Sequence, residues 1–315
     1  MQKEFKNIIN LFRENENSLN KIIVSVFIKS NAIKVRNNAL IKSLIISENS
    51  PLSQYIHLNF KLTFDDLIEA FELAIPKNKQ IVNGAVYTPN YIKTFIVENS
   101  FSKMEKPHIN ALVADIACGC GAFLYTVSNK LKSTTNKTYY QIFNENIFGL
   151  DISKTSIERT EILLSLLALA NDEDRKEFKF NLHCANALSF DWLKNESKIM
   201  ENSGFDLIVG NPPYVRAKNI DKDSKMLLSN WAVTKSGNPD LYIPFFEIGL
   251  TQLNKNGVLG YIAANSFYKS VNARQLRKYL QEKKYDLSII DFGHEKLFGN
   301  FCEKRRNSRS FRYGS

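Results

Sequence analysis

Cysteine is scarce in this chain of 315 residues, and no two cysteines have the C-x-x-C spacing of a zinc site or a redox motif. The four are Cys118, Cys120, Cys184 and Cys302, and a chain of this length does not need disulfide bonds to fold. This usage is typical of a reducing compartment, so we expect a cytoplasmic protein. The four histidines are scattered, and we therefore expect no metal site.

Long hydrophobic runs are also missing. The longest apolar stretches, such as residues 162–170, are too short to cross a bilayer, and the first residues do not resemble a signal peptide. We therefore expect no membrane partner. With 44% hydrophobic residues the chain can nevertheless bury a core, which argues against disorder. The net charge of +10 favours a polyanionic partner or indicates only a lysine-rich surface, and charge alone does not separate these readings.

The chain changes character along its length. Residues 1–80 are predicted to form a helical N-terminal region, because apolar residues recur there on single helical faces, as at Phe5, Ile8, Ile9 and Phe12. No chemical motif marks this region. From about residue 110, short apolar runs alternate with helical segments, which predicts an α/β fold with a parallel sheet covered by helices on both faces.

The predicted elements can be placed by residue range. Strands are expected at residues 112–116, 147–150, 178–183, 205–209, 258–263 and 287–292. Helices are expected at residues 122–132, 153–170, 241–253 and 273–282, and residues 133–146 are expected to be a polar insert. In such sheets, ligands bind beyond the carboxyl ends of the strands, near the point where the strand order reverses.

Polar residues and glycines follow the first three predicted strands. Gly119 and Gly121 open a helix, where glycine permits a sharp turn and close approach of a ligand. Asp151 ends the second strand, where it can accept hydrogen bonds from ribose hydroxyls or cap the next helix. Asn186 follows the third strand and can bind an adenine edge or form a turn. Together these positions predict a nucleoside cofactor.

The fourth predicted strand ends in Asn211, Pro212, Pro213 and Tyr214. Two prolines stiffen the backbone and remove two N–H donors, so the Asn211 side-chain oxygen and nearby carbonyls form a cluster of acceptors. A planar exocyclic amine would satisfy that cluster, and Tyr214 would stack on its ring. The amine of adenine is a poor nucleophile, and positioned acceptors would direct its lone pair toward a methyl donor. The simpler alternative is a proline-stiffened turn.

These motifs, in this order, resemble the class I methyltransferases that depend on S-adenosylmethionine (SAM). They are most similar to the adenine-specific (N6) DNA methyltransferases of restriction-modification systems, of the TaqI and Eco57I type. The resemblance runs from about residue 84 to about residue 298. The segments that carry it are Gly84–Pro89 (G-x-x-Y-T-P), Asp115–Leu124 (D-x-A-C-G-x-G), Asn211–Tyr214 (N-P-P-Y), Asp240–Phe245 (D-L-Y-x-x-F), Gly257–Phe267 and Ile290–Phe298.

The resemblance implies a Rossmann-like fold and a role for each matched residue. The residues that it places at SAM are Tyr87, Thr88, Pro89, Asp115, Ala117, Gly119, Gly121, Asp151, Asn186 and Ala187. Asn186 stands where the family has Asp, which alters the expected contact with the adenine of SAM. Asn211–Tyr214 would be the catalytic motif, and Tyr214 and Phe298 would stack on an adenine flipped out of double-stranded DNA. The alternative for Phe298 is a core residue.

The family resemblance also divides the chain. Residues 81–300 would be the catalytic domain, and residues 301–315 form a basic tail that we expect to be disordered, where relatives continue into a target-recognition domain. A separate specificity or restriction subunit is then a possible partner. Two alternatives stay open: a protein-glutamine methyltransferase, which also uses N-P-P-Y, and an inactive fragment that only binds SAM or DNA.

Overall fold

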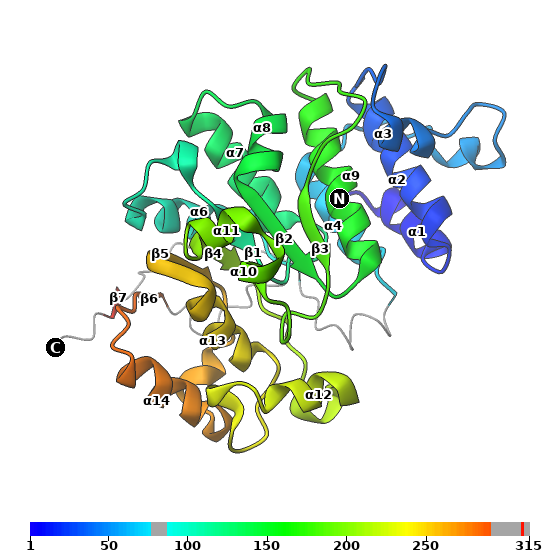
Figure 1. Cartoon of the computed structure of the whole chain (residues 1–315). Coiled ribbons are helices and arrows are strands. Elements are labelled where there is room, and N and C mark those ends of the chain that lie inside the picture. The colour runs from blue at the N-terminus through cyan, green and yellow to red at the C-terminus, as the bar shows by residue number, and fades with distance from the viewer. Residues whose placement is uncertain (77–86, 291–309, 312–315) are drawn as a thin grey trace.

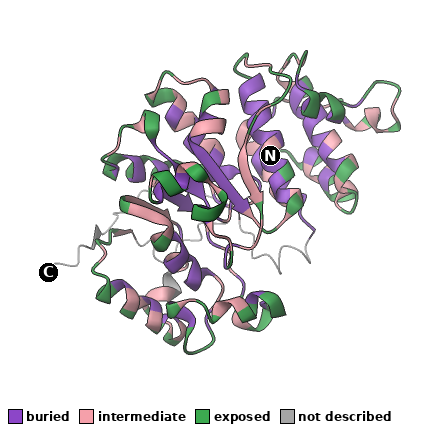
Figure 2. Cartoon of the chain, viewed as in Figure 1, coloured by how far each residue is buried: buried purple, intermediate pink, exposed green. Residues whose placement is uncertain are grey.

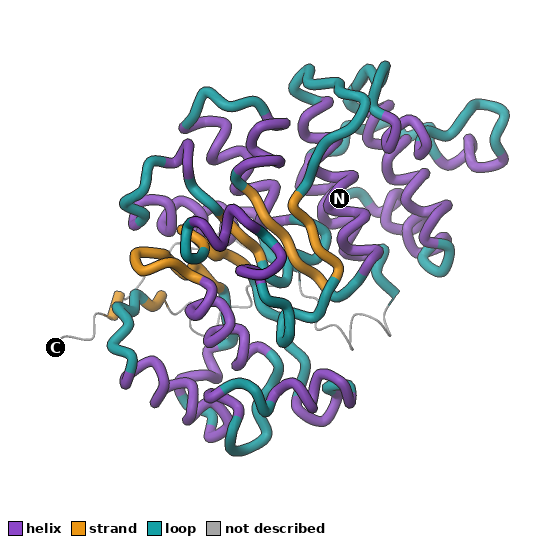
Figure 3. Tube along the Cα trace, in the orientation of Figure 1, coloured by secondary structure: helices purple, strands orange, loops and turns teal. Residues whose placement is uncertain are grey.

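The computed structural model describes residues 1–76, 87–290 and 310–311, and its centre is a parallel β-sheet (Figures 1 and 3). Five strands in these residues form the sheet, in the order β3-β2-β1-β4-β5. Their bounds are β1 Val113–Asp115, β2 Ile147–Asp151, β3 Asn181–Cys184, β4 Phe205–Gly210 and β5 Leu253–Tyr261. All four neighbouring pairs are parallel, as the sequence predicted.

Helices cover both faces of the sheet, which confirms the predicted α/β fold. One face packs on α6 Asn90–Lys103, α7 Ala122–Thr134 and α9 Lys154–Leu169, and the other on α10 Trp192–Asn195, α11 Ser197–Glu201 and α13 Tyr242–Gln252. The strands obey the two-residue period of a sheet, since Val113 faces the first group and Ala114 the second. Strands β1, β2 and β4 and the facing sides of these helices are buried, whereas the edge strands β3 and β5 are mostly half-buried (Figure 2).

The strand order reverses at β1, and this fixes where a ligand can bind. From β1 the chain moves outward through β2 to β3, and then returns to the opposite side of β1 to form β4. The register pairs Val113 with Leu207 and Ala114 with Ile208, so the two strands end side by side. The carboxyl ends of β1 and β4 therefore form the topological switch point.

The N-terminal helices pack beside α9, on one side of the molecule (Figure 1). They are α1 Lys3–Phe12, α2 Glu16–Ser30, α3 Ala39–Leu44 and α4 Phe64–Leu73. Their hydrophobic core also includes Ile162, Leu163 and Leu166 of α9 and Cys120 of the glycine turn. The helical region predicted for residues 1–80 thus shares its core with the sheet-bearing part of the chain.

A smaller hydrophobic cluster lies among the elements that follow β4. Two further helices belong to this part, α12 Lys222–Leu228 and α14 Arg274–Glu282. Leu276 and Leu280 of α14 pack against Tyr242 and Ile243 of α13. Short 3-10 helices occupy Pro51–Tyr55, His108–Asn110, Ala217–Asn219, Ala232–Thr234, Asn265–Tyr268 and Val271–Ala273.

Strands β3 and β5 begin at Asn181 and Leu253, whereas they were predicted to begin at residues 178 and 258. Two further predicted elements differ in kind from the structure. The insert at residues 133–146 contains a helix, α8 Tyr139–Glu145. Of the strand predicted at 287–292, only β6 Ile289–Ile290 is formed in the described part, and it pairs antiparallel with β7 Ser310–Phe311 instead of joining the sheet. Membership of a sheet depends on how a connection returns the chain to an edge, which residues 287–292 do not encode. No described helix has the length and apolar composition needed to cross a membrane.

Candidate functional site

The two glycines of the turn after β1 have different surroundings. Gly119 and Gly121 both have positive φ values, +53° and +86°, in the region that glycine adopts most readily. A Cβ atom on Gly121 would lie 2.8 Å from the methyl carbon of Thr160 on α9, whereas one on Gly119 would meet nothing within 4 Å. The turn is therefore packed against α9 on one side and open on the other, as a ligand-binding turn requires.

Asp151 connects the end of β2 to this turn. Its Oδ2 accepts a hydrogen bond from the Gly119 N–H at 2.9 Å, and its Oδ1 accepts one from the Ser153 N–H at 2.8 Å. The N-cap of α9 is Ser153, so the alternative role of Asp151 as that cap is wrong. Each carboxylate oxygen retains a further lone pair that can accept a hydroxyl.

Asp115 lies buried at the switch point. Its Oδ1 accepts a hydrogen bond from the Ala117 N–H at 3.0 Å, and a Cβ atom on Gly210 would lie 2.7 Å from the same oxygen. The end of β4 thus passes directly against the Asp115 carboxyl. Burial raises the pKa of Asp115 to about 8, and the nearby Asp151 adds to the rise.

Asn211 lies directly after β4, and its side chain is hydrogen-bonded to the segment before α6. Its Nδ2 donates a hydrogen bond to Oγ1 of the buried Thr88 at 3.0 Å, across 123 residues of sequence. Because the amide is planar, this bond directs its Oδ1 away from Thr88. The structure therefore brings the Y-T-P and N-P-P-Y segments together beside the switch point. Pro89 is the N-cap of α6.

Tyr214 is anchored at both its ring and its hydroxyl. The O–H donates to the Ile262 carbonyl at 3.2 Å, and the ring centroid lies 5.9 Å from that of Tyr242. Burial raises the pKa of Tyr214 well above its usual value, so the phenol stays protonated. These contacts fix the ring at the edge of the cluster that contains α13 and α14.

Asn186 forms the turn that the sequence offered as an alternative. Its Oδ1 accepts the Leu188 N–H at 3.0 Å, and its Nδ2 donates to the Ser224 Oγ of α12 at 3.2 Å. The neighbouring Ala187 is buried. The side-chain amide of Asn186 is thus used to hold α12 against the segment that follows β3.

Tyr87 and Phe298 were also predicted to be site residues. Tyr87 is half-buried and packs against the N-terminal core, where burial and then the Asp65 carboxylate raise its pKa to about 12. Phe298 lies outside the described residues, as do residues 84–86 of the G-x-x-Y-T-P segment. The cofactor-binding role of Tyr87 and the base-stacking role of Phe298 remain predictions.

Two residues of α9 beneath the turn were not predicted from the sequence. Thr160 donates its hydroxyl to the Gly119 carbonyl at 3.0 Å, and the adjacent Arg159 is only 1% exposed. The sequence around them, Glu158–Glu161, has the charged composition of a solvated helix face, so no local signal distinguishes a buried arginine there.

Comparisons with known proteins agree with this geometry. Residues 145–298 match the family described as "Eco57I restriction-modification methylase". The chain is 29% identical over 273 residues to the type II restriction enzyme and methyltransferase RM.Eco57I of Escherichia coli, covering 71% of this chain and 27% of that protein. It is 29% identical over 227 residues to the type II methyltransferase M.BanIII of Aneurinibacillus aneurinilyticus, covering 70% of this chain and 37% of that one.

Solved structures share the fold at low identity. The type IIG restriction endonuclease BpuSI matches with a TM-score of 0.65 and 15% identity, over 94% of this chain and 37% of that one. The DrdV–DNA complex matches with a TM-score of 0.60 and 13% identity, over 91% and 38%. The chain spans well under half the length of these relatives. Residues 145–298 thus match the Eco57I family of restriction-modification methylases, and about 70% of the chain is similar to type II methyltransferases of restriction-modification systems.

Proposed function

We propose that this chain binds SAM at the carboxyl ends of β1, β2 and β4 and methylates N6 of adenine in DNA, as the modification activity of a restriction-modification system. The observation that carries the proposal is the position of Asn211. Its side chain is held by Thr88 at the switch point, directly after the strand that passes Asp115. A substrate amine bound at Asn211 would therefore face the ligand-binding turn.

The residues at the switch point fit SAM. Gly119 has open space where a side chain would be, which admits the methionine part of the cofactor against the backbone. Asp151 lies one strand farther out, where its carboxylate can accept both ribose hydroxyls. Bound SAM would supply a methyl group on a sulfonium.

The chain's own groups would hold the adenine amine. The Asn211 Oδ1 is directed away from Thr88, and Pro212 and Pro213 contribute no N–H donors that would compete for the acceptors around it. An amine with two hydrogens would donate to these acceptors, which directs its lone pair toward the methyl donor. The anchored ring of Tyr214 would stack on the base and offset part of the cost of flipping it out of the duplex.

DNA is the proposed acceptor for two reasons. The relatives with curated names are restriction-modification enzymes, and one matched structure is a complex with DNA. Exposed cations also follow the N-P-P-Y motif closely, at Arg216, Lys218, Lys222 and Lys225. Such cations would bind phosphates and release counterions.

A binding and acceptor experiment tests this function. We expect isothermal calorimetry to detect SAM binding by the native chain, and Asp151→Ala to weaken it at least about tenfold, because hydrogen bonds to a charged acceptor are worth about 1.5–3 kcal/mol. The exposed Asp191→Ala is the matched control and should leave the affinity unchanged. Labelled SAM should then transfer its methyl group to duplex DNA and not to a translation release factor. Transfer to the release factor alone would replace DNA with a protein substrate.

A further inference from the structure

Arg159 connects the N-terminal helices to the methyltransferase fold. It lies in α9 with 1% of its surface exposed. Its Nε donates a hydrogen bond to Oδ1 of Asn20 in α2 at 3.1 Å, and its Nη1 donates to the carbonyl of Phe71 in α4 at 3.0 Å. A buried guanidinium depends on such partners, since losing one leaves a desolvated charge without compensation.

The same guanidinium reaches the glycine turn at Cys120. The Cys120 thiol is 1% exposed and shares the hydrophobic cluster of the N-terminal helices. Burial raises the pKa of Cys120 to about 12, and the positive charge of the nearby Arg159 opposes the rise. Arg159 thus lies near the buried side of the turn, and the adjacent Thr160 contacts it, whereas the other side of the turn, at Gly119, is open.

Helix α9 supports the turn at a second, adjacent point. Thr160 donates its hydroxyl to the Gly119 carbonyl, and its methyl carbon is the atom that a Cβ on Gly121 would strike. A shift of α9 therefore displaces the backbone that would receive the cofactor. The N-terminal helices pack along α9, beside the sheet (Figure 1). Their contact with Arg159 can therefore set the position of α9 relative to the glycine turn.

We propose that Arg159 is a positioning residue for the glycine turn, through which α2 and α4 set the affinity of the chain for its cofactor. The inference rests on the proposed function, because the affinity in question is for SAM. Arg159 acts from behind the turn and does not touch the ligand. The N-terminal helices would then have a role in the cofactor site, although they lack a chemical motif.

The same interface offers a matched control. Thr155, in the first turn of α9, donates its hydroxyl to Oε2 of Glu16 in α2 at 2.8 Å. This bond also joins the N-terminal helices to α9, but it has no contact with the glycine turn. A purely structural role for the interface would make the Thr155 and Asn20 contacts equivalent in their effect on SAM.

Isothermal calorimetry with SAM tests the proposal on the full chain. We expect Asn20→Leu, which removes the acceptor for Arg159, to weaken SAM binding about fivefold to tenfold, the size of a typical coupling between sites. Asn20→Asp keeps an acceptor and should retain an affinity close to the native value. Thr155→Val should bind SAM like the native chain, and circular dichroism should show every variant to be folded.

A double-mutant cycle separates positioning from general destabilisation. If Arg159 transmits the effect through Cys120, Asn20→Leu should change the SAM affinity much less in a Cys120→Ala background than in the native one. Equal losses for Asn20→Leu and Thr155→Val, or a native affinity for folded Asn20→Leu, would overturn this inference alone. A native chain that binds no SAM would overturn the proposed function together with it.

Discussion

Gly119 and Gly121 lie two residues apart and have separate reasons to be glycine. Both have positive φ, but only the Cβ position of Gly121 is occupied, by the side chain of Thr160. The pattern G-x-G in the sequence marks a turn that a ligand can approach, and it does not reveal which glycine faces the ligand. That assignment requires the packing of α9, which lies about 40 residues farther along the chain.

The two glycines should therefore differ when each is replaced by alanine. Gly119→Ala incurs only the cost of a left-handed conformation, about 1–2 kcal/mol, whereas Gly121→Ala adds a steric collision with Thr160. We expect Gly121→Ala to lower the free energy of unfolding in urea by clearly more than Gly119→Ala. Equal losses would mean that the turn does not press on α9 as described.

Asp115 should make stability depend on pH. Burial, followed in the same direction by the charge of Asp151, raises the pKa of Asp115 to about 8 in the folded chain, against about 3.9 when unfolded. When folding raises the pKa of a carboxyl group, the group's contribution to stability is fully present at pH values below its unfolded pKa. That contribution is lost as the pH rises through its folded pKa. Between about pH 4 and pH 8, Asp115 should therefore increasingly destabilise the fold.

Urea unfolding at a series of pH values measures this effect. The side chain introduced by Asp115→Asn cannot ionise. The free energy of unfolding of this variant should therefore increase relative to that of the native chain as the pH rises from 5 to 8. The Asp151 carboxyl, whose pKa is also raised by burial, remains in both proteins. A difference between the two proteins that stays constant with pH would contradict the predicted ionisation.

At the scale of elements, the sequence predicted β1, β2 and β4 closely because each is a short apolar run that ends at a polar residue or glycine. The bounds of β3 and β5 were predicted less well, because polar residues occur within both strands. Helix α8 was missed because residues 133–146 are polar overall. A capping box was nevertheless present: the Thr138 hydroxyl accepts from the Gln141 N–H, and the Gln141 side chain accepts from the Thr138 N–H. The pattern T-x-x-Q was the available signal.

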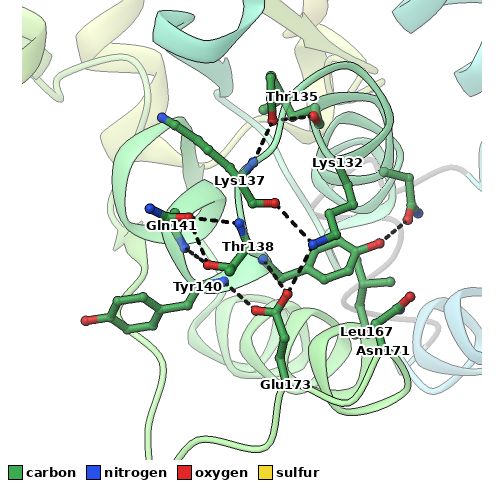
Figure 4. A network of polar contacts seen from close by, with 12 residues as sticks. Lys132, Thr135, Lys137, Thr138, Tyr140, Gln141, Leu167, Asn171 and Glu173 are labelled. Carbon is green, nitrogen blue, oxygen red and sulfur yellow. Dashed lines mark hydrogen bonds and ion pairs between the residues drawn. The ribbon is translucent and has the colours of Figure 1, made fainter.

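A distant carboxylate also stabilises the start of α8 (Figure 4). Glu173 accepts hydrogen bonds from the backbone N–H groups of Tyr139 and Tyr140, at 2.9 and 3.1 Å, and its Oε1 lies 3.4 Å from Nζ of Lys132. A negative group at a helix N-terminus satisfies N–H donors that lack partners within the helix. Sequence patterns cannot predict this contact, because Glu173 is more than 30 residues away.

Replacing Glu173 should therefore destabilise the chain. Glu173→Ala leaves two backbone donors of α8 without their acceptor, and we expect a loss of about 1–3 kcal/mol in the free energy of unfolding. The exposed Glu177→Ala should change it by less than about 0.5 kcal/mol. Native-state hydrogen exchange gives the sharper readout, since amides of α8 should lose protection first. Equal protection of α8 in the native chain and Glu173→Ala would exclude this role.

At the scale of the molecule, the packing of the N-terminal region was the feature least predictable from the sequence. Helical periodicity predicted its helices, but their packing on α9 depends on long-range contacts such as those of Asn20 and Phe71 with Arg159. The catalytic half was predictable because its motifs follow successive strands, and parallel strands bring their carboxyl ends to one edge. The contact between Asn211 and Thr88, which the sequence did not reveal, joins the N-P-P-Y motif after β4 to the Y-T-P segment before α6.

The proposed methyl transfer requires that Asn211 act on an adenine amine. The most direct measurement incubates the native chain and Asn211→Ala with SAM and plasmid DNA and quantifies N6-methyladenine by mass spectrometry of the digested nucleosides. Asn99→Ala, an exposed asparagine of α6, is the control. We predict N6-methyladenine with the native chain and the control, and at least about a hundredfold less with Asn211→Ala, although that variant still binds SAM. Methylation by Asn211→Ala at the native rate, or methylation by the native chain at another atom of DNA, would contradict the account.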